Sequence, residues 1–257
     1  SKALFLNLLH TNASFMERTL CFDFGNSRLK CAVFVGRDLQ ETIHLENDSE
    51  QTIAEVLKSH HPQKIILSSV IKHRDGLEAQ LGAVAKFHML GHASKLPIST
   101  PVGKPETIGA DRLALCSAAV DLFEGQHNLA IGLGTCITYN FVNKYHEFLG
   151  GSISPGMNMR FRAMHEQTAL LPLIVAQSQF PLVGYDTKTN LLSGVILGMA
   201  KEIDGIIEAY GQKYSNFNVL LTGGDMPFFV PHLKNRIFAD PNLIFKGLYA
   251  ISEINNG

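Results

Sequence analysis

The chain has 257 residues, of which 46% are hydrophobic and 18% are charged, and 22 basic against 23 acidic residues give a formal net charge of −1. This length is enough for one large domain or two ordinary ones, each with a buried core. The balanced charge, without a basic tail or stripe, argues against proteins that bind nucleic acid or an anionic membrane surface by bulk electrostatics.

The first 15 residues do not have the pattern of a secretory signal peptide. Their apolar stretch, residues 3–9, is short, and no small-residue cleavage site follows it. We expect residues 1–17 to form an N-terminal extension, with Met16 as a candidate start of the native chain. No stretch approaches the roughly 20 apolar residues of a membrane helix, so we expect a soluble, cytoplasmic protein. The cysteines show no CxxC spacing and predict free buried thiols in a reducing compartment: Cys21, Cys31, Cys116 and Cys136.

The first convincing elements are two strands joined by a glycine turn. Two β-prone runs, 19–24 and 30–35, surround Gly25. A glycine lets the backbone approach a phosphate closely, and successive turn amides form an anion-binding concavity. Lys30 adds a cation, and Asp23 can hold a magnesium ion directly or through water. A plain hairpin explains the same residues equally well, because Gly-Asn beside Asp is ordinary turn chemistry.

The next elements have the order of a βαβ unit. Helical periodicity over 51–60 precedes a buried strand over 64–70, and a second amphipathic helix is predicted over 75–85. A loop with three prolines, 96–107, leads into a helix that begins at Gly109 and ends near residue 123.

An aspartate lies at the start of this last helix. Asp111 in the sequence Gly109-Ala110-Asp111-Arg112 is well placed to cap the helix. The functional alternative is a general base that accepts a proton from a substrate hydroxyl. Arg112 would then orient polar or anionic parts of the substrate.

A second strand–turn–strand pattern follows 109 residues after the first. The strands 129–133 and 137–142 surround Gly134 and Thr135, a second candidate phosphate-binding turn. The repeat indicates either an internal duplication or a coincidence between two glycine hairpins. We place the boundary near residue 125, which divides the chain into domains 18–125 and 126–257.

The remainder of the chain is predicted to be largely helical. Ser154-Pro155-Gly156 opens a helix that continues to Leu171, and a long helix spans 192–210. Gly194 and Gly198 on the long helix allow close helix approach, either within the chain or between copies. A short buried strand runs into Thr222-Gly223-Gly224, where paired glycines allow a flat ring such as adenine to approach the backbone.

Taken in order, these motifs resemble the type III pantothenate kinase family of the actin-like, sugar-kinase-like ATPases. The resemblance covers nearly the whole chain after Met16, and its strongest motifs are DFGNSRLK at 23–30, GADR at 109–112 and LGGSISPGMNMR at 149–160. It implies an α/β fold with two ribonuclease-H-like domains, whose mixed sheets are flanked by helices, and an active site in the cleft between them. It also implies a homodimer.

The resemblance implies an ATP- and Mg²⁺-dependent kinase that converts pantothenate to 4'-phosphopantothenate, the first step of coenzyme A synthesis. Asp111 matches the proton acceptor, and Asp23 the residue that holds magnesium. The implied ATP-binding residues are Asp23, Phe24, Gly25, Asn26, Ser27, Arg28, Leu29, Lys30 and Thr135. The implied substrate-binding residues are Gly109, Ala110, Asp111, Arg112 and Thr187.

The chain departs from the family pattern at a few positions. Gly132 stands where the family has an aspartate that binds a monovalent cation, K⁺ or NH₄⁺, and Asn140 stands where a second acidic residue is common. The departure predicts that the cation is not required or that other ligands hold it. Val102 lies in the region of a family tyrosine near the substrate. Two alternatives stay open: a kinase for another small hydroxylated metabolite, and a non-catalytic regulatory homologue.

Overall fold

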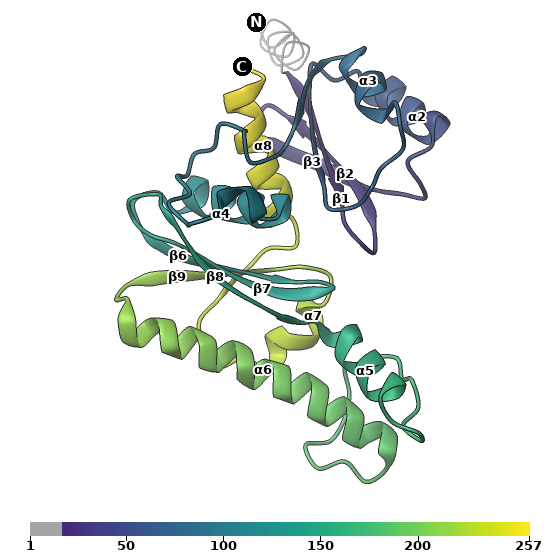
Figure 1. Cartoon of the computed structure of the whole chain (residues 1–257), viewed down its shortest axis with the longest axis vertical. Helices are drawn as coiled ribbons and strands as arrows, with labels where there is room; N and C mark the ends of the chain where they lie inside the picture. The colour runs from purple at the N-terminus through teal and green to yellow at the C-terminus, as the bar shows by residue number, and fades with distance from the viewer. Residues whose placement is uncertain (1–16) are drawn as a thin grey trace, which may run out of the picture. The chain divides into compact units, whose positions relative to one another are not determined.

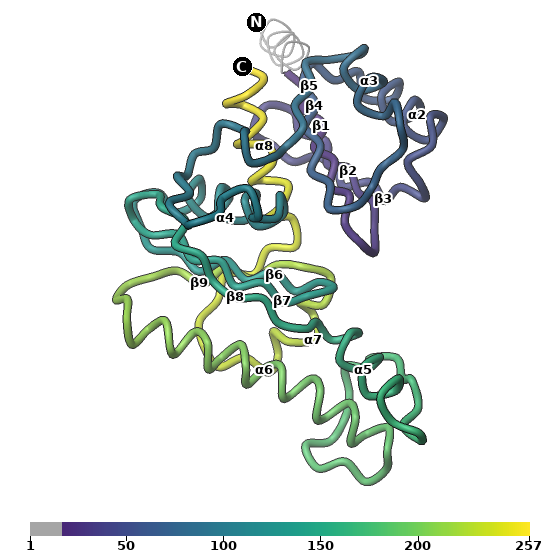
Figure 2. Tube along the Cα trace, viewed as in Figure 1, coloured from purple at the N-terminus to yellow at the C-terminus, as the bar shows by residue number. Residues whose placement is uncertain are grey.

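A computed structural model describes residues 17–257, so the predicted N-terminal extension lies outside the described residues except for Glu17. The chain forms two compact units, each built on one five-stranded sheet (Figures 1 and 2). Unit 1 contains the described residues up to Leu96 together with Glu106–Ala114 and Leu248–Gly257. Unit 2 contains Pro97–Pro105 and Leu115–Gly247. The predicted division at residue 125 separates the strands of the two sheets, and as a boundary between duplicated domains it stays a prediction.

The first sheet combines antiparallel and parallel pairing. Its order is β3-β2-β1-β4-β5; β1, β2 and β3 pair antiparallel, whereas β4 and β5 continue parallel to β1. The crossover from β3 to β4 runs through a helix, as parallel pairing requires. The bounds are β1 Arg18–Phe24, β2 Leu29–Val35, β3 Asp38–Leu45, α2 Glu50–His60, β4 Lys64–Ser69, α3 Leu77–Gly82 and β5 Lys86–Met89.

Successive side chains of a strand point to opposite faces of the sheet, so the two faces of the first sheet contact different parts of the chain. Leu20, Phe22 and Phe24 of β1 pack into a core with α2 and α3, which Figure 1 shows on one side of the sheet. Residues 248–257 contact part of the opposite face. There the ring of Tyr249 stacks on that of Phe34 with centroids 4.7 Å apart.

The second sheet repeats the strand arrangement of the first. Its order, read from the hairpin edge, is β8-β7-β6-β9-β10, with β6, β7 and β8 antiparallel and β9 and β10 parallel to β6. Strand β6 thus takes the place of β1. The bounds are β6 His127–Leu133, β7 Cys136–Val142, β8 Phe148–Pro155, β9 Phe217–Thr222 and β10 Phe238–Ala239. The internal duplication indicated by the two glycine turns is confirmed.

Helix α6 runs along one face of the second sheet (Figure 1). Its apolar residues, from Leu191 to Ile207, share a core with β6, β7 and β9. The helix begins at a capping box, in which the Asp186 carboxylate accepts a hydrogen bond from the Thr189 amide at 2.7 Å. The remaining bounds are η1 Pro105–Thr107, α4 Ala110–Leu122, α5 Met157–Glu166, α6 Thr187–Lys213, α7 Met226–Phe229, η2 Val230–His232 and α8 Leu243–Asn255.

Several predicted element bounds are wrong. The helix that opens at Gly156 ends at Glu166 rather than Leu171, whereas the long helix begins at Thr187, earlier than predicted. The edge strands β3 and β8 were not predicted, because each has an exposed face and β8 contains Gly150-Gly151. Among the helices of residues 17–257, none is long and apolar enough to cross a membrane.

Candidate active site

In unit 1, three polar residues lie side by side on neighbouring strands. Asp23 on β1 is the register partner of Lys30 on β2 and of Ser68 on β4. Register partners project from the same face of a sheet, so these side chains form a row across it. The row lies on the face opposite the Phe22 core, near the carboxyl ends of β1 and β4. Open α/β sheets bind ligands at this end.

The turn after β1 is tight and polar. The Gly25 amide donates a hydrogen bond to the Arg28 carbonyl at 3.1 Å. Asn26, Ser27 and Arg28 are exposed, whereas the side chain of Phe24 is fully buried in the core. Within the predicted ATP-binding segment, the exposed polar side chains and the backbone are therefore accessible to a ligand, and the Phe24 side chain is structural.

Asp111 lies at the start of α4 but does not occupy the cap position. The Gly109 carbonyl accepts from the amides of Arg112 and Leu113, at 3.0 and 3.2 Å, so Gly109 precedes the first helical residue. A Cβ atom at Gly109 would lie 2.5 Å from Asp111 Oδ1. The carboxylate of Asp111 thus lies over Gly109, and a side chain at position 109 would displace it.

Asp23 and Asp111 lie near enough in unit 1 for the charge of Asp111 to act on the Asp23 carboxyl group. Burial raises the pKa of Asp23 to about 6; the Lys30 ammonium opposes this change, and the negative charge of Asp111 adds to it. A half-buried carboxylate with a raised pKa is typical of functional sites. Both carboxylates belong to unit 1, in the segments that the sequence singled out.

In unit 2, the turn between β6 and β7 packs against the start of α5. The Gly134 amide donates to the Cys136 carbonyl at 3.0 Å, and the Gly156 amide donates to the Thr135 carbonyl at 3.1 Å. A Cβ atom at Gly156 would lie 2.5 Å from the Thr135 oxygen. The glycine of the Ser-Pro-Gly motif is therefore required because the turn approaches it so closely.

The segment after β9 contacts Leu133, the last residue of β6 before this turn. Gly223 has a φ of +111°, and a side chain there would overlap the backbone of Leu133. The Asp225 amide donates to the Leu133 carbonyl at 3.3 Å. Three predicted segments, namely the Thr135 turn, the α5 start and Thr222-Gly223-Gly224, thus form one local site in unit 2.

Thr187 lies elsewhere in unit 2. It is the exposed first residue of α6, inside the capping box of Asp186 and Thr189. Its role in substrate binding stays a prediction.

The sequence did not single out Arg160, whose side chain holds the segment just before α5 by hydrogen bonds. Arg160 Nε donates to the Pro155 carbonyl at 2.9 Å, and its Nη2 donates to Ser154 Oγ at 3.1 Å and pairs with Glu202. Tyr139 also donates to Glu202, at 3.1 Å. Arg160 closes the LGGSISPGMNMR motif, and that position was the only signal in the sequence.

The carboxylates do not form a multidentate metal site. Across residues 17–257, no group of three or more His, Cys, Asp and Glu is arranged to hold a metal ion.

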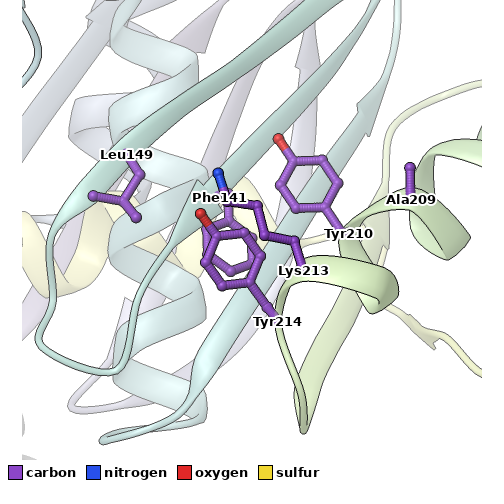
Figure 3. Close-up of a pocket in the computed structure, with 6 residues that line it drawn as sticks. All are labelled: Phe141, Leu149, Ala209, Tyr210, Lys213 and Tyr214. Carbon is purple, nitrogen blue, oxygen red and sulfur yellow. The ribbon is translucent and has the colours of Figure 1, made fainter.

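Unit 2 also contains an aromatic pocket of about 270 Å³ (Figure 3). Tyr210 and Lys213 of α6, together with Tyr214 just after its end, line the pocket beside Phe141 on β7. The Phe141 and Tyr214 rings stack with centroids 4.2 Å apart. Phe141 pairs with Leu129 near the start of β6, whereas the Thr135 turn follows its end. The pocket is therefore distinct from the predicted site.

Comparisons with known proteins agree with the motifs. A family model described as type III pantothenate kinase matches residues 19–209. A type III pantothenate kinase of Cytophaga hutchinsonii is 39% identical over 236 residues, which cover 92% of this chain and 99% of the relative. One of Bacteroides fragilis (strain YCH46) is 40% identical over 240 residues, 93% of this chain and 98% of the relative.

Among solved structures, the glucokinase of an Antarctic psychrotroph superposes with a TM-score of 0.52 at 9% identity, covering 93% of this chain and 99% of the other. This likeness concerns the fold alone, which is a duplicated ribonuclease-H-like fold. The family match and the near-complete alignment of both relatives then show that the chain belongs to the type III pantothenate kinase family.

Proposed function

We propose that this chain transfers the terminal phosphoryl group of ATP to the primary hydroxyl of pantothenate, forming 4'-phosphopantothenate. The observation that carries the proposal is the proximity of Asp23 and Asp111, which stand in the ATP and substrate motifs of the family. Membership of a kinase family implies ATP as the phosphoryl donor and Mg²⁺ as its cation. A cytoplasmic location stays a prediction; the four cysteines, all among the described residues, form no disulfide.

Asp111 is the base in this proposal. Phosphoryl transfer depends on positioning and charge stabilisation more than on covalent chemistry. Asp111 accepts the hydroxyl proton as the oxygen attacks, and Arg112 orients the substrate. Gly109 and Ala110 place both residues at the start of α4.

Asp23 fits a site for magnesium-bound ATP. When bound, ATP would supply the phosphoryl group, and the magnesium ion would neutralise the negative charge of the phosphates. Burial makes the ionised Asp23 costly in the free protein, and a nearby cation removes that cost. The amides of the Gly25 turn and the Lys30 ammonium bind phosphate oxygens. In unit 2, Thr135 is the ATP contact.

The place of the family's monovalent cation does not fit an ion. A Cβ atom at Gly132 would lie 2.9 Å from Thr138 Oγ1 and 3.1 Å from Leu115 Cδ1. The buried Asn140 amide nitrogen donates to the Ala130 carbonyl at 3.1 Å and to Thr138 Oγ1 at 3.2 Å. These contacts leave no room for a side chain at position 132, and neither Gly132 nor Asn140 supplies a charged ligand. We infer that catalysis does not require K⁺ or NH₄⁺ there.

The chain acts as a homodimer in this proposal. A Cβ atom at Gly194 or Gly198 of α6 would meet nothing within 4 Å, so these glycines do not serve packing within the described chain. The segment before α6 is strongly apolar and exposed; Leu170 is 92% and Val175 is 83% exposed. Large exposed apolar surfaces mark association sites.

A coupled assay of ATP consumption tests the proposed function. ADP formation should depend on pantothenate and on Mg²⁺, and a product of the mass of 4'-phosphopantothenate should accumulate. Turnover with a hexose but not with pantothenate would instead support a kinase for another metabolite. Binding of Mg·ATP without turnover of pantothenate or a hexose would support a non-catalytic homologue.

A further inference from the structure

Ser68 is a fully buried serine whose hydroxyl has no hydrogen-bond partner among residues 17–257. Buried hydroxyls are nearly always paired, because leaving one unpaired costs free energy. Ser252, a buried serine of α8, illustrates the usual case, since its Oγ contacts Asn256 Nδ2 at 3.0 Å. The exception at Ser68 needs a physical reason.

The position of Ser68 suggests the reason. It pairs in register with Asp23, so both side chains lie on the same face of the first sheet. Its neighbour Leu67 belongs to the core on the opposite face. The unpaired hydroxyl therefore lies next to the carboxylate proposed to hold magnesium.

The duplicated sheet has a hydroxyl at the equivalent place. Thr222 on β9 pairs with Gly132 on β6, as Ser68 on β4 pairs with Asp23 on β1. Thr222 directly precedes the glycine pair of the local site in unit 2. In both sheets, a residue with a hydroxyl group thus lies near the carboxyl end of the strand that pairs parallel with the central strand, β4 beside β1 and β9 beside β6.

We propose that Ser68 is a binding residue of the Mg·ATP site, where its hydroxyl donates a hydrogen bond to an oxygen of the phosphate and water shell of the magnesium ion. This inference rests on the proposed function. No described protein group pairs with this hydroxyl, and the bound nucleotide supplies its partner.

The test compares Ser68→Ala and Ser68→Cys with Ser252→Ala in the full chain. Thermal unfolding is measured without ligand, and binding of a non-hydrolysable ATP analogue is measured by calorimetry with Mg²⁺ and with EDTA. We expect both Ser68 variants to unfold at or above the wild-type temperature and to bind the magnesium-loaded analogue roughly tenfold or more weakly. Ser252→Ala should unfold at a lower temperature and bind the analogue as the wild type does.

The EDTA measurement locates the contact. A loss that appears only with Mg²⁺ places the hydroxyl on a metal-bound water, and a loss under both conditions places it on a phosphate oxygen. Wild-type affinity in both Ser68 variants would overturn the proposal. If the wild type fails to phosphorylate pantothenate but the Ser68 variants bind Mg·ATP weakly, the proposed substrate is wrong and the role of Ser68 stands.

Discussion

The negative charge of Asp111, at the start of α4, acts on Asp23 at the end of β1 and adds to burial in raising its pKa to about 6. Two carboxylates that repel each other reduce the stability of the free protein when both are ionised. A bound cation reverses this effect, so the pair favours the metal-bound nucleotide over the empty site.

Replacing Asp111 by asparagine should remove the base and leave the fold intact. A general base contributes about 10²–10⁴-fold to turnover, so kcat should fall by that factor while Mg·ATP still binds. The matched control is Asp121→Asn, which changes an exposed carboxylate near the other end of α4 and should keep wild-type turnover. Near wild-type kcat in Asp111→Asn would remove the assignment of the base.

Asp23 should make stability depend on pH in an unusual direction. Between about pH 4 and pH 6 the folded protein retains the Asp23 proton while the unfolded chain releases it, so the free energy of unfolding falls as pH rises through this window. The loss is complete above about pH 7, where it is on the order of 1–3 kcal/mol. Urea denaturation should therefore show Asp23→Asn gaining stability over wild type from pH 4 to pH 6 and keeping the gain above it.

The same variant should bind Mg·ATP poorly at every pH, whereas the wild type should lose affinity only as pH falls through about 6. The exposed Asp75→Asn serves as the control for the stability measurement. If the free energies of unfolding of Asp23→Asn and wild type differed by the same amount at every pH, the assigned pKa would be contradicted.

The sequence predicted the paired turns and Asp111 because their residues are local signals: glycine, small polar residues and a helix start. It could not predict the row formed by Lys30, Asp23 and Ser68, because strand pairing brings Ser68 to Asp23 across 45 residues of chain. Strand β8 escaped prediction for a similar reason: an edge strand exposes much of its surface and lacks a continuous apolar pattern.

Turnover should be the same in K⁺, NH₄⁺ and tetramethylammonium salts at equal ionic strength, because Thr138 and Leu115 occupy the space at Gly132. The structural basis can be tested separately. Gly132→Ala should lower the free energy of unfolding by about 1–3 kcal/mol through overpacking, and adding Thr138→Ala should restore part of it. Gly91→Ala, which places its methyl in open space, is the control. Activation by K⁺ would contradict the inference.

Gly156→Ala should displace the Thr135 turn, because the new methyl group would overlap the Gly134 and Thr135 carbonyl oxygens. We expect the KM for ATP to rise by roughly tenfold or more, since a misplaced contact costs both binding and orientation. Gly103→Ala adds a methyl group where no atom lies within 4 Å and should keep the wild-type KM. An unchanged KM in Gly156→Ala would show that the turn does not contact ATP.

If α6 forms the dimer interface, large side chains in place of Gly194 and Gly198 should separate the subunits. Helices whose contact residues are small approach most closely, and two arginines would force apart any partner seated on this face of α6. Sedimentation velocity of Gly194→Arg/Gly198→Arg should therefore show a monomer where the wild type is a dimer. Gln51→Arg, on the exposed side of α2 in unit 1, should remain dimeric. A double variant that sediments as the wild type would place the association surface elsewhere, with the exposed apolar segment around Leu170 and Val175 as the next surface to change.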